Sequence, residues 1–182
     1  MPSARHPRPP VSDAQSDRAL VVLIGAPGAG KTRTGKRLAR VLEAPLVDTD
    51  SRIVAAHGPI AEIFATHGEE HFRALERDAV ARALGERAVV TLGGGAVLDP
   101  QTRAELAHHR VVQLTVSADA VASRIAGGKR PLLKDGVGAW QALVAQRQPI
   151  YDELSQLTID TSRLPLDRVA TQIAAWLERQ EP

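Results

Sequence analysis

The sequence contains no cysteine among its 182 residues, which excludes disulfide bonds, thiol catalysis and cysteine-ligated zinc. Aromatic residues amount to only 3%, and the net charge is +2 without any run of basic residues, so the patterns of a nucleic-acid-binding surface are missing. No apolar stretch approaches the roughly 18 residues of a membrane-spanning helix. We therefore expect a cytoplasmic protein that binds neither nucleic acid nor membrane, with a monomer as the default assembly.

Asparagine is also absent, so the chain lacks the Asn-Lys-x-Asp guanine signature expected of a GTPase. The six histidines show no metal-ligand spacing apart from His67 and His71, and these two do not belong to an H-E-x-x-H pattern. We interpret the histidines as surface residues. The two tryptophans, Trp140 and Trp176, are isolated in the sequence and are expected to pack against neighbouring side chains.

Residues 1–18 are rich in proline, arginine and serine and show no apolar periodicity. This composition is typical of a disordered N-terminal tail, although a partner-binding arm is the alternative. The segment has no hydrophobic stretch of the kind that a signal peptide requires. Residues 19–182 suit one domain, because a chain of this length can bury about 70% of its unfolded surface without disulfides.

From Ala19 onward, short apolar runs alternate with amphipathic segments. The predicted strands are residues 20–24, 45–47, 88–92, 111–116 and 157–159. The predicted helices are residues 31–42, 51–56, 60–67, 69–84, 100–108, 118–126, 137–153 and 166–179. Alternating strands and helices with apolar strands indicate a parallel sheet covered on both faces. We therefore predict a three-layer α/β/α sandwich around five parallel strands.

A complete phosphate-binding loop, G-x-x-x-x-G-K-T, runs from Gly25 to Thr32 directly after the first predicted strand. Its glycines allow a sharp turn that lays backbone N–H groups against phosphate oxygens, and the start of the next helix adds anion affinity. In such a loop Lys31 reaches the β- and γ-phosphates, and the Thr32 hydroxyl is placed to bind Mg²⁺. The motif predicts a nucleotide-phosphate site; the alternative is a glycine-rich turn without a ligand.

Three further features follow strands, and the carboxyl ends of parallel strands share one edge of the sheet. Asp48-Thr49-Asp50 follows the second strand, and its two carboxylates suit phosphoryl transfer, one near a metal's water shell and one at the acceptor hydroxyl. The alternative is a helix cap by Asp50 with a solvated Asp48. Residues 93–95, three glycines after the third strand, indicate a close backbone approach, or else a plain turn. Residues 127–136, which place cations between glycines and a proline, are predicted to form a mobile lid beyond the fourth strand.

The chain resembles the shikimate kinase family along nearly all of its globular part, from about Leu20 to Trp176. The matching segments, in order, are Asp48-Thr-Asp50, Ile60-Ala-Glu-Ile-Phe64, Gly68-Glu-Glu-His-Phe-Arg73 with Glu76, Leu92-Gly-Gly-Gly95, Arg130-Pro-Leu-Leu133 and Arg147-Gln-Pro-Ile-Tyr151. Each motif is weak alone, whereas their order is specific. The resemblance implies a fold like that of nucleoside monophosphate kinases and an ATP-dependent transfer of the γ-phosphate to the 3-hydroxyl of shikimate, with Mg²⁺.

The resemblance also implies roles for individual residues. Asp50 would be the catalytic base and contact the shikimate hydroxyls, and Asp48 would hold Mg²⁺ through water together with Thr32. Lys31 and Arg130 would stabilise the transferring charge, with Arg130 carried by the lid. The residues expected to bind ATP are Gly28, Ala29, Gly30, Lys31, Thr32, Arg33, Arg124, Arg130 and Arg163. Those expected to bind shikimate are Asp50, Arg73, Gly94 and Arg147, because the two guanidinium groups suit a carboxylate.

Each arginine also has a structural alternative. Arg73 precedes Glu76 by three residues and would then form a surface ion pair, which contributes well under about 1 kcal/mol. Arg147 would cover a helix end, and Arg130 would serve only the solubility of its loop. At the level of function, the alternatives are a kinase of another hydroxy acid such as gluconate, and a non-catalytic ligand sensor that keeps the fold.

Overall fold

The computed structural model describes residues 18–126 and 136–180, and of residues 124–126 the backbone only. The predicted tail and lid lie outside the described residues, apart from Arg18 and Gly136. Five strands form one parallel sheet in the order β2-β3-β1-β4-β5. They are β1 (Val21–Gly25), β2 (Leu46–Asp48), β3 (Val89–Thr91), β4 (Val111–Thr115) and β5 (Leu157–Asp160).

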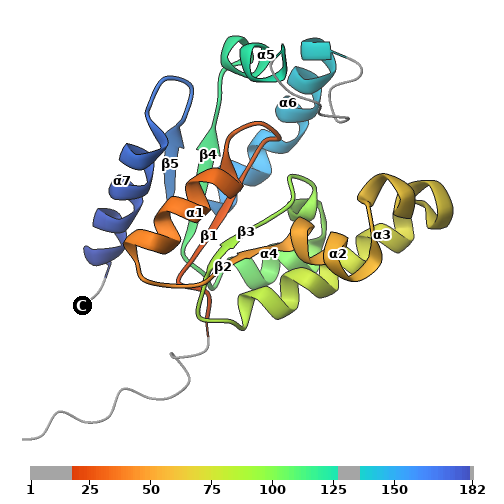
Figure 1. Cartoon of the computed structure of the whole chain (residues 1–182), viewed down its shortest axis with the longest axis horizontal. Coiled ribbons are helices and arrows are strands. Elements are labelled where there is room, and N and C mark those ends of the chain that lie inside the picture. Colours follow the sequence, from red (N-terminus) through yellow and green to blue (C-terminus); the bar gives the residue numbers. More distant parts are fainter. Residues whose placement is uncertain (1–17, 127–135, 181–182) are drawn as a thin grey trace, which may run out of the picture.

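The helices connect these strands and lie on both faces of the sheet (Figure 1). They are α1 (Lys31–Val41), α2 (Thr49–His57), α3 (Ile60–Leu84), α4 (Pro100–Leu106), α5 (Ala118–Ala126), α6 (Gly136–Leu154) and α7 (Leu166–Glu178), with a single 3-10 turn η2 (Ala96–Leu98). The predicted α/β/α architecture with a five-stranded parallel sheet is therefore confirmed.

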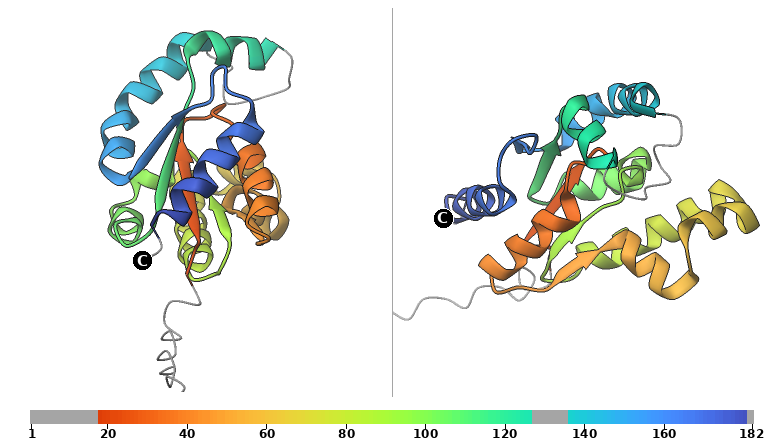
Figure 2. Two further views of the ribbon diagram at one scale, coloured as in Figure 1. Left: turned by 90° about the vertical axis from the view of Figure 1, so that its left-hand side faces the viewer. Right: turned by 45° about the horizontal axis from the view of Figure 1, so that its top comes forward.

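Alternation along the central strand β1 explains the three layers, since successive side chains of a strand point to opposite faces. Val21 and Leu23 pack into a core cluster with residues of α1 and α7. Val22 and Ile24 pack into a second cluster with residues of α3, α4 and α6. All four side chains are essentially inaccessible to solvent, which is why this strand is apolar throughout. Figure 2 shows the two helical layers on either side of the sheet.

The main departures from the predicted elements concern α2 and α3. Helix α2 begins at Thr49 because Asp48 is its N-cap, with its carboxylate accepting a hydrogen bond of 2.9 Å from the Ser51 backbone N–H. The predicted helices 60–67 and 69–84 form one element, α3, which is kinked where Gly68 adopts a φ of 82°. The turn η2 was not predicted, since three residues are too few to show a helical period.

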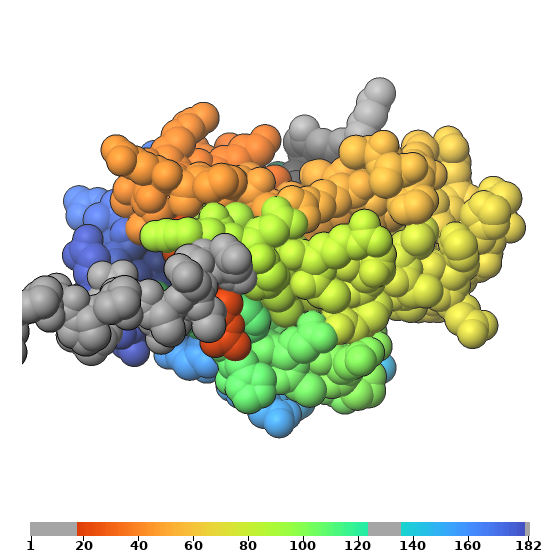
Figure 3. All heavy atoms as spheres, turned by 90° about the horizontal axis from the view of Figure 1, so that it is seen from below, coloured from red at the N-terminus to blue at the C-terminus, as the bar shows by residue number. Residues whose placement is uncertain are grey.

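The strands all run in one direction, so their carboxyl ends gather at one end of the molecule. Figure 3 views the opposite end, where the start of β1 emerges between surfaces formed by α3 and α4. The phosphate loop, the Asp48–Asp50 segment and the Gly93–Gly95 segment all follow strands and therefore lie at the carboxyl end. The fold thus brings together segments that are separated by as many as seventy residues of chain.

Candidate active site

The phosphate loop connects β1 to α1 in a conformation that only glycine adopts readily. Gly25, Gly28 and Gly30 have φ values of 137°, 88° and 88°, in the left-handed region that disfavours a Cβ atom. A side chain on Gly25 would also collide with the Leu114 carbonyl oxygen of β4. Lys31 Nζ donates hydrogen bonds to the carbonyl oxygens of Gly25 (2.7 Å) and Ala26 (3.1 Å), so its ammonium group lies over the loop.

Asp48 is the centre of a hydrogen-bond cluster that joins the phosphate loop to the second and third strands. Its Oδ2 accepts hydrogen bonds from the hydroxyls of Thr32 (2.6 Å) and Thr91 (2.9 Å). Burial raises the pKa of Asp48, but the hydrogen bonds from Thr32, Ser51 and Thr91 outweigh burial and hold it below its usual value. The carboxylate is therefore anionic, beside a hydroxyl at the start of α1.

Thr32 and Asp48 fit a magnesium ion, since Mg²⁺ prefers hydroxyl and carboxylate oxygens and keeps several water ligands. Within residues 18–126 and 136–180, no group of three or more histidine, aspartate or glutamate side chains could hold a metal by itself. The pair therefore suits an ion that is shared with nucleotide phosphates rather than one caged by protein alone.

Asp50 lies in the first turn of α2, and its environment disfavours the charged form. Burial and repulsion by Asp48 raise its pKa, while Lys31 and Arg73 pull the pKa down only in part. Its Oδ1 is one of three buried side-chain atoms in the described part of the chain that lack a hydrogen-bond partner. An unpartnered carboxylate oxygen with a raised pKa is typical of a group that meets a ligand proton.

The three glycines after β3 are each close to a different charged side chain. A Cβ on Gly93 would lie 2.5 Å from Asp50 Oδ1, and one on Gly94 would lie 3.5 Å from Arg147 Nη1. A Cβ on Gly95 would collide with the guanidinium group of Arg73. The predicted close approach is therefore present, and it is to charged groups of the protein itself. The predicted contact of Gly94 with substrate stays a prediction.

Arg73 on α3 lies beside these glycines and is held by two carboxylates of its own helix. It donates to Glu76 at 2.6 Å and to Glu69 at 3.2 and 3.3 Å, and its guanidinium carbon lies 5.4 Å from the centroid of the Phe72 ring. The pair with Glu76 is not on the surface, because the Glu76 side chain is only 5% exposed. The alternative of a plain surface ion pair is therefore wrong.

Arg147 approaches the same place from α6. Its Nε is another of the buried atoms without a hydrogen-bond partner among the described residues. Its charge lowers the pKa of Tyr151, against the larger effect of burial, and so places the guanidinium next to that phenol. Asp50, Arg73, Gly94 and Arg147 are therefore adjacent, as the motif order predicted, although they come from four different elements.

The predicted adenine contacts are less completely described. Arg163 and Arg33 are exposed, beyond β5 and on α1 respectively. Arg124 lies in α5 with its side chain outside the description, and Arg130 lies outside the described residues. Thr161 was not predicted: its buried Oγ1 lies 2.9 Å from the carbonyl oxygen of Ala29 and ties the segment after β5 to the phosphate loop.

The comparisons with known proteins agree with this geometry. The family model described as shikimate kinase matches residues 27–178. The chain belongs to the shikimate kinase family. A shikimate kinase from Thermobifida fusca is 48% identical over 166 residues, which are 89% of this chain and 96% of that protein. A shikimate kinase from Mycobacterium tuberculosis is 43% identical over 88% of this chain and 94% of its own length.

Among solved structures, a shikimate kinase from Acinetobacter baumannii in complex with shikimate superimposes with a TM-score of 0.83. It is 29% identical, and the alignment covers 94% of this chain and all of that one. The resemblance stated from the ordered motifs is therefore confirmed. As a member of the shikimate kinase family, the chain is an ATP-dependent phosphotransferase.

Glu76 is a site residue whose place the sequence reasoning missed, since it was considered only as the partner of a surface pair. It is 4% exposed, and the pKa of its carboxyl is raised by burial, lowered by Arg73 and raised by Asp50. A signal was present in the sequence: Glu76 falls between Phe72 and Val80 on the buried stripe of α3. A charge on an apolar stripe is rarely buried without a partner, which Arg73 supplies.

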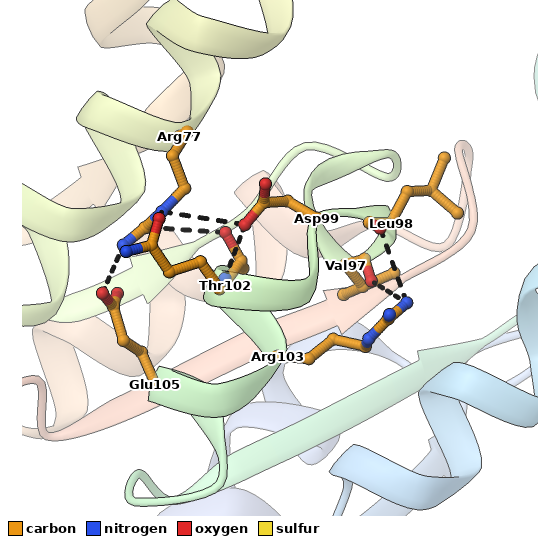
Figure 4. A network of polar contacts seen from close by, with 8 residues as sticks. Arg77, Val97, Leu98, Asp99, Thr102, Arg103 and Glu105 are labelled. Atoms are coloured by element: carbon orange, nitrogen blue, oxygen red, sulfur yellow. Dashed lines mark hydrogen bonds and ion pairs between the residues drawn. The ribbon is translucent and has the colours of Figure 1, made fainter.

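A second network supports the glycine segment from behind. Arg77, the neighbour of Glu76, pairs with Glu105 and lies 3.7 Å from Asp99, so that α3 is tied to α4 and to the end of η2 (Figure 4). Arg103 lies 3.4 Å from the Val97 carbonyl oxygen of η2. These contacts hold the chain that follows Gly95 against α3.

Replacing Gly95 by alanine is expected to lower kcat/KM for the acceptor by about 10²-fold, because displacing a binding group by about 1 Å costs that much. The φ of Gly95 is −93°, so alanine introduces no backbone strain and acts through its collision with Arg73. Gly138→Ala is the matched control, since a Cβ there meets no atom within 4 Å. Steady-state kinetics of both variants checks this, and equal kinetics would contradict the contact.

Proposed function

We propose that the chain transfers the γ-phosphoryl group of ATP to the 3-hydroxyl of shikimate and releases shikimate 3-phosphate and ADP. The observation that carries the proposal is the pairing of Arg73 and Arg147 around Asp50, at the edge of the sheet that also carries the phosphate loop. Two guanidinium groups beside one carboxylate suit an acceptor that has both an acid group and a hydroxyl group. The shikimate complex of the Acinetobacter baumannii relative supports the same acceptor.

In this proposal the acceptor is oriented by its carboxylate. Arg147 uses its unpartnered Nε and Arg73 its terminal nitrogens, while Glu76 keeps Arg73 in place. The backbone of Gly94 lies against the ring. Asp50, whose Oδ1 has no hydrogen-bond partner among the described residues, accepts the proton of the hydroxyl that attacks the phosphorus.

On the donor side, the phosphate loop binds the nucleotide phosphates through its backbone N–H groups. Lys31 leaves the carbonyl oxygens that it now contacts and reaches the β- and γ-phosphates. Thr32 and Asp48 would hold Mg²⁺, which supplies neutralisation of phosphate charge when bound. Arg130 and Arg124, which lie in or next to the predicted lid, and Arg163 and Arg33 complete the proposed ATP contacts.

The test is ADP release measured with ATP and Mg²⁺, with shikimate present and absent. We expect release that depends on shikimate and that falls sharply when gluconate or a neutral polyol replaces it. Equal rates with gluconate would favour a broader hydroxy-acid kinase, and shikimate binding without ADP release would favour a ligand sensor. No helix within the described residues is long and apolar enough to cross a membrane. A cytoplasmic location and a monomeric state remain predictions.

A further inference from the structure

Helix α6 carries three large polar side chains on one face. Arg147 and Tyr151 follow Trp140 by seven and eleven residues, and at about 100° per residue these spacings return to within about 20° of the same direction. All three point into the carboxyl edge of the sheet, yet only Arg147 was assigned a role above. The other two contact the two loops that meet at the candidate active site.

Trp140 contacts the donor loop. Its indole Nε1 donates a hydrogen bond of 2.8 Å to the carbonyl oxygen of Pro27, in the middle of the phosphate loop. The ring is 5% exposed and packs in a small cluster with Ala26 and Val121. A buried indole N–H requires an acceptor, and here the acceptor is backbone of the loop that binds phosphate.

Tyr151 contacts the acceptor loop. Its hydroxyl donates a hydrogen bond of 2.7 Å to the carbonyl oxygen of Gly94, and its side chain is 1% exposed. The same hydroxyl lies beside the Arg147 guanidinium. The phenol therefore fixes the backbone against which the proposed substrate lies, together with the arginine that binds the substrate carboxylate.

The two loops also touch each other directly. A Cβ on Gly94 would lie 3.3 Å from Cδ of Pro27, so the proline ring of the phosphate loop rests on the backbone of the acceptor loop. Pro27 and Gly94 are thus in contact, and each carbonyl oxygen is held by a side chain of the same helix, three turns apart. A rigid helix that grips both loops sets the distance between them.

We propose that α6 is the spacer that fixes the separation of the donor and acceptor loops, with Trp140 and Tyr151 as its two positioning residues. Phosphoryl transfer requires the reacting atoms about 3 to 3.5 Å apart and in line, so a fixed loop separation contributes directly to the rate. The acceptor half of this inference rests on the function proposed above. The donor half requires only that the phosphate loop binds a nucleotide.

The experiment removes each hydrogen bond and keeps the ring. Trp140→Phe is expected to weaken ADP binding and raise KM for ATP about tenfold, with KM for shikimate within about twofold, because a buried carbonyl oxygen loses its donor. Tyr151→Phe is expected to do the converse, raising KM for shikimate and leaving ADP binding unchanged. Both variants are expected to lower kcat, since each loosens the spacing. Trp176→Phe, on α7 and away from both loops, is the control for a tryptophan-to-phenylalanine change.

Thermal unfolding and calorimetric ADP binding accompany the kinetics, because neither requires turnover. Wild-type ADP affinity in Trp140→Phe, or an equal rise of both KM values in both variants, would overturn the inference and leave the two side chains with a packing role only. Weakened ADP binding in Trp140→Phe in a protein that does not phosphorylate shikimate would overturn the proposed function and the acceptor half while supporting the donor half.

Discussion

Asp50→Asn is expected to lower kcat by about 10²- to 10⁴-fold while leaving the protein folded and no less stable than the wild type. The amide has the shape of the carboxylate but cannot accept the proton of the attacking hydroxyl. Its effect on stability follows from the raised pKa of Asp50. Because the folded-state pKa lies above the unfolded one, the ionised form is disfavoured in the fold, and at neutral pH its charge costs stability.

Asp48→Asn is the matched comparison for stability, since it makes the same substitution two residues away. The pKa of Asp48 is lowered in the fold, so its charge contributes stability that is present above the unfolded pKa and is lost as pH falls. We therefore expect the melting temperature at pH 7 to fall for Asp48→Asn and to stay level or rise for Asp50→Asn. Opposite signs, or near-normal turnover of Asp50→Asn, would contradict the assignment of the base.

The raised pKa of Asp50 also sets the expected pH dependence of the wild type. The base acts only when it is ionised, so kcat/KM falls as pH drops through the pKa of Asp50, above the ordinary value of about 3.9 for aspartate. In Asp50→Asn this acid limb is expected to disappear from the residual activity.

The sequence predicted the fold well because the strands are apolar on both faces. Val21 to Ile24 are all buried, and such a run between helical periods has one common explanation, a central parallel strand. The phosphate loop was equally clear, since three of its glycines have φ values that other residues avoid. The break at Gly68 was also expected, although the chain continues through it as one kinked helix.

The acceptor side could be predicted only as far as its motifs reached. The three glycines indicated a close approach, but not that Asp50, Arg147 and Arg73 each face one of them. That correspondence depends on the crossing of α2, α3 and α6, which no local pattern encodes. Glu76 was missed for a related reason, because its burial follows from the packing of α3 against the glycine segment.

The contacts of Trp140 and Tyr151 had no local signal at all. Their partners are backbone carbonyl oxygens that lie 113 and 57 residues away in the chain. A backbone acceptor has no residue identity, so no motif can record it. Packing was correctly expected for Trp140, which lies in a buried cluster, but its hydrogen bond to the phosphate loop was not.

Arg147→Ala is expected to raise KM for shikimate by about 10²-fold or more, with a smaller fall in kcat and little change in KM for ATP, because a buried charge-assisted contact contributes about 2 to 5 kcal/mol. The guanidinium is positioned before substrate arrives: it lies next to Gly94 and the Tyr151 hydroxyl, and its Nε has no hydrogen-bond partner among the described residues. Steady-state kinetics with each substrate varied in turn separates the two KM values.

Two variants sharpen this result. Arg147→Lys keeps the charge but loses the planar fork, so KM for shikimate should fall between those of the wild type and Arg147→Ala. Arg103→Ala removes an arginine that contacts only the carbonyl oxygens of Val97 and Leu98, and its KM for shikimate should stay at the wild-type value. If Arg147→Ala instead raised both KM values equally, the arginine would act through the packing of α6 rather than through the carboxylate of the acceptor.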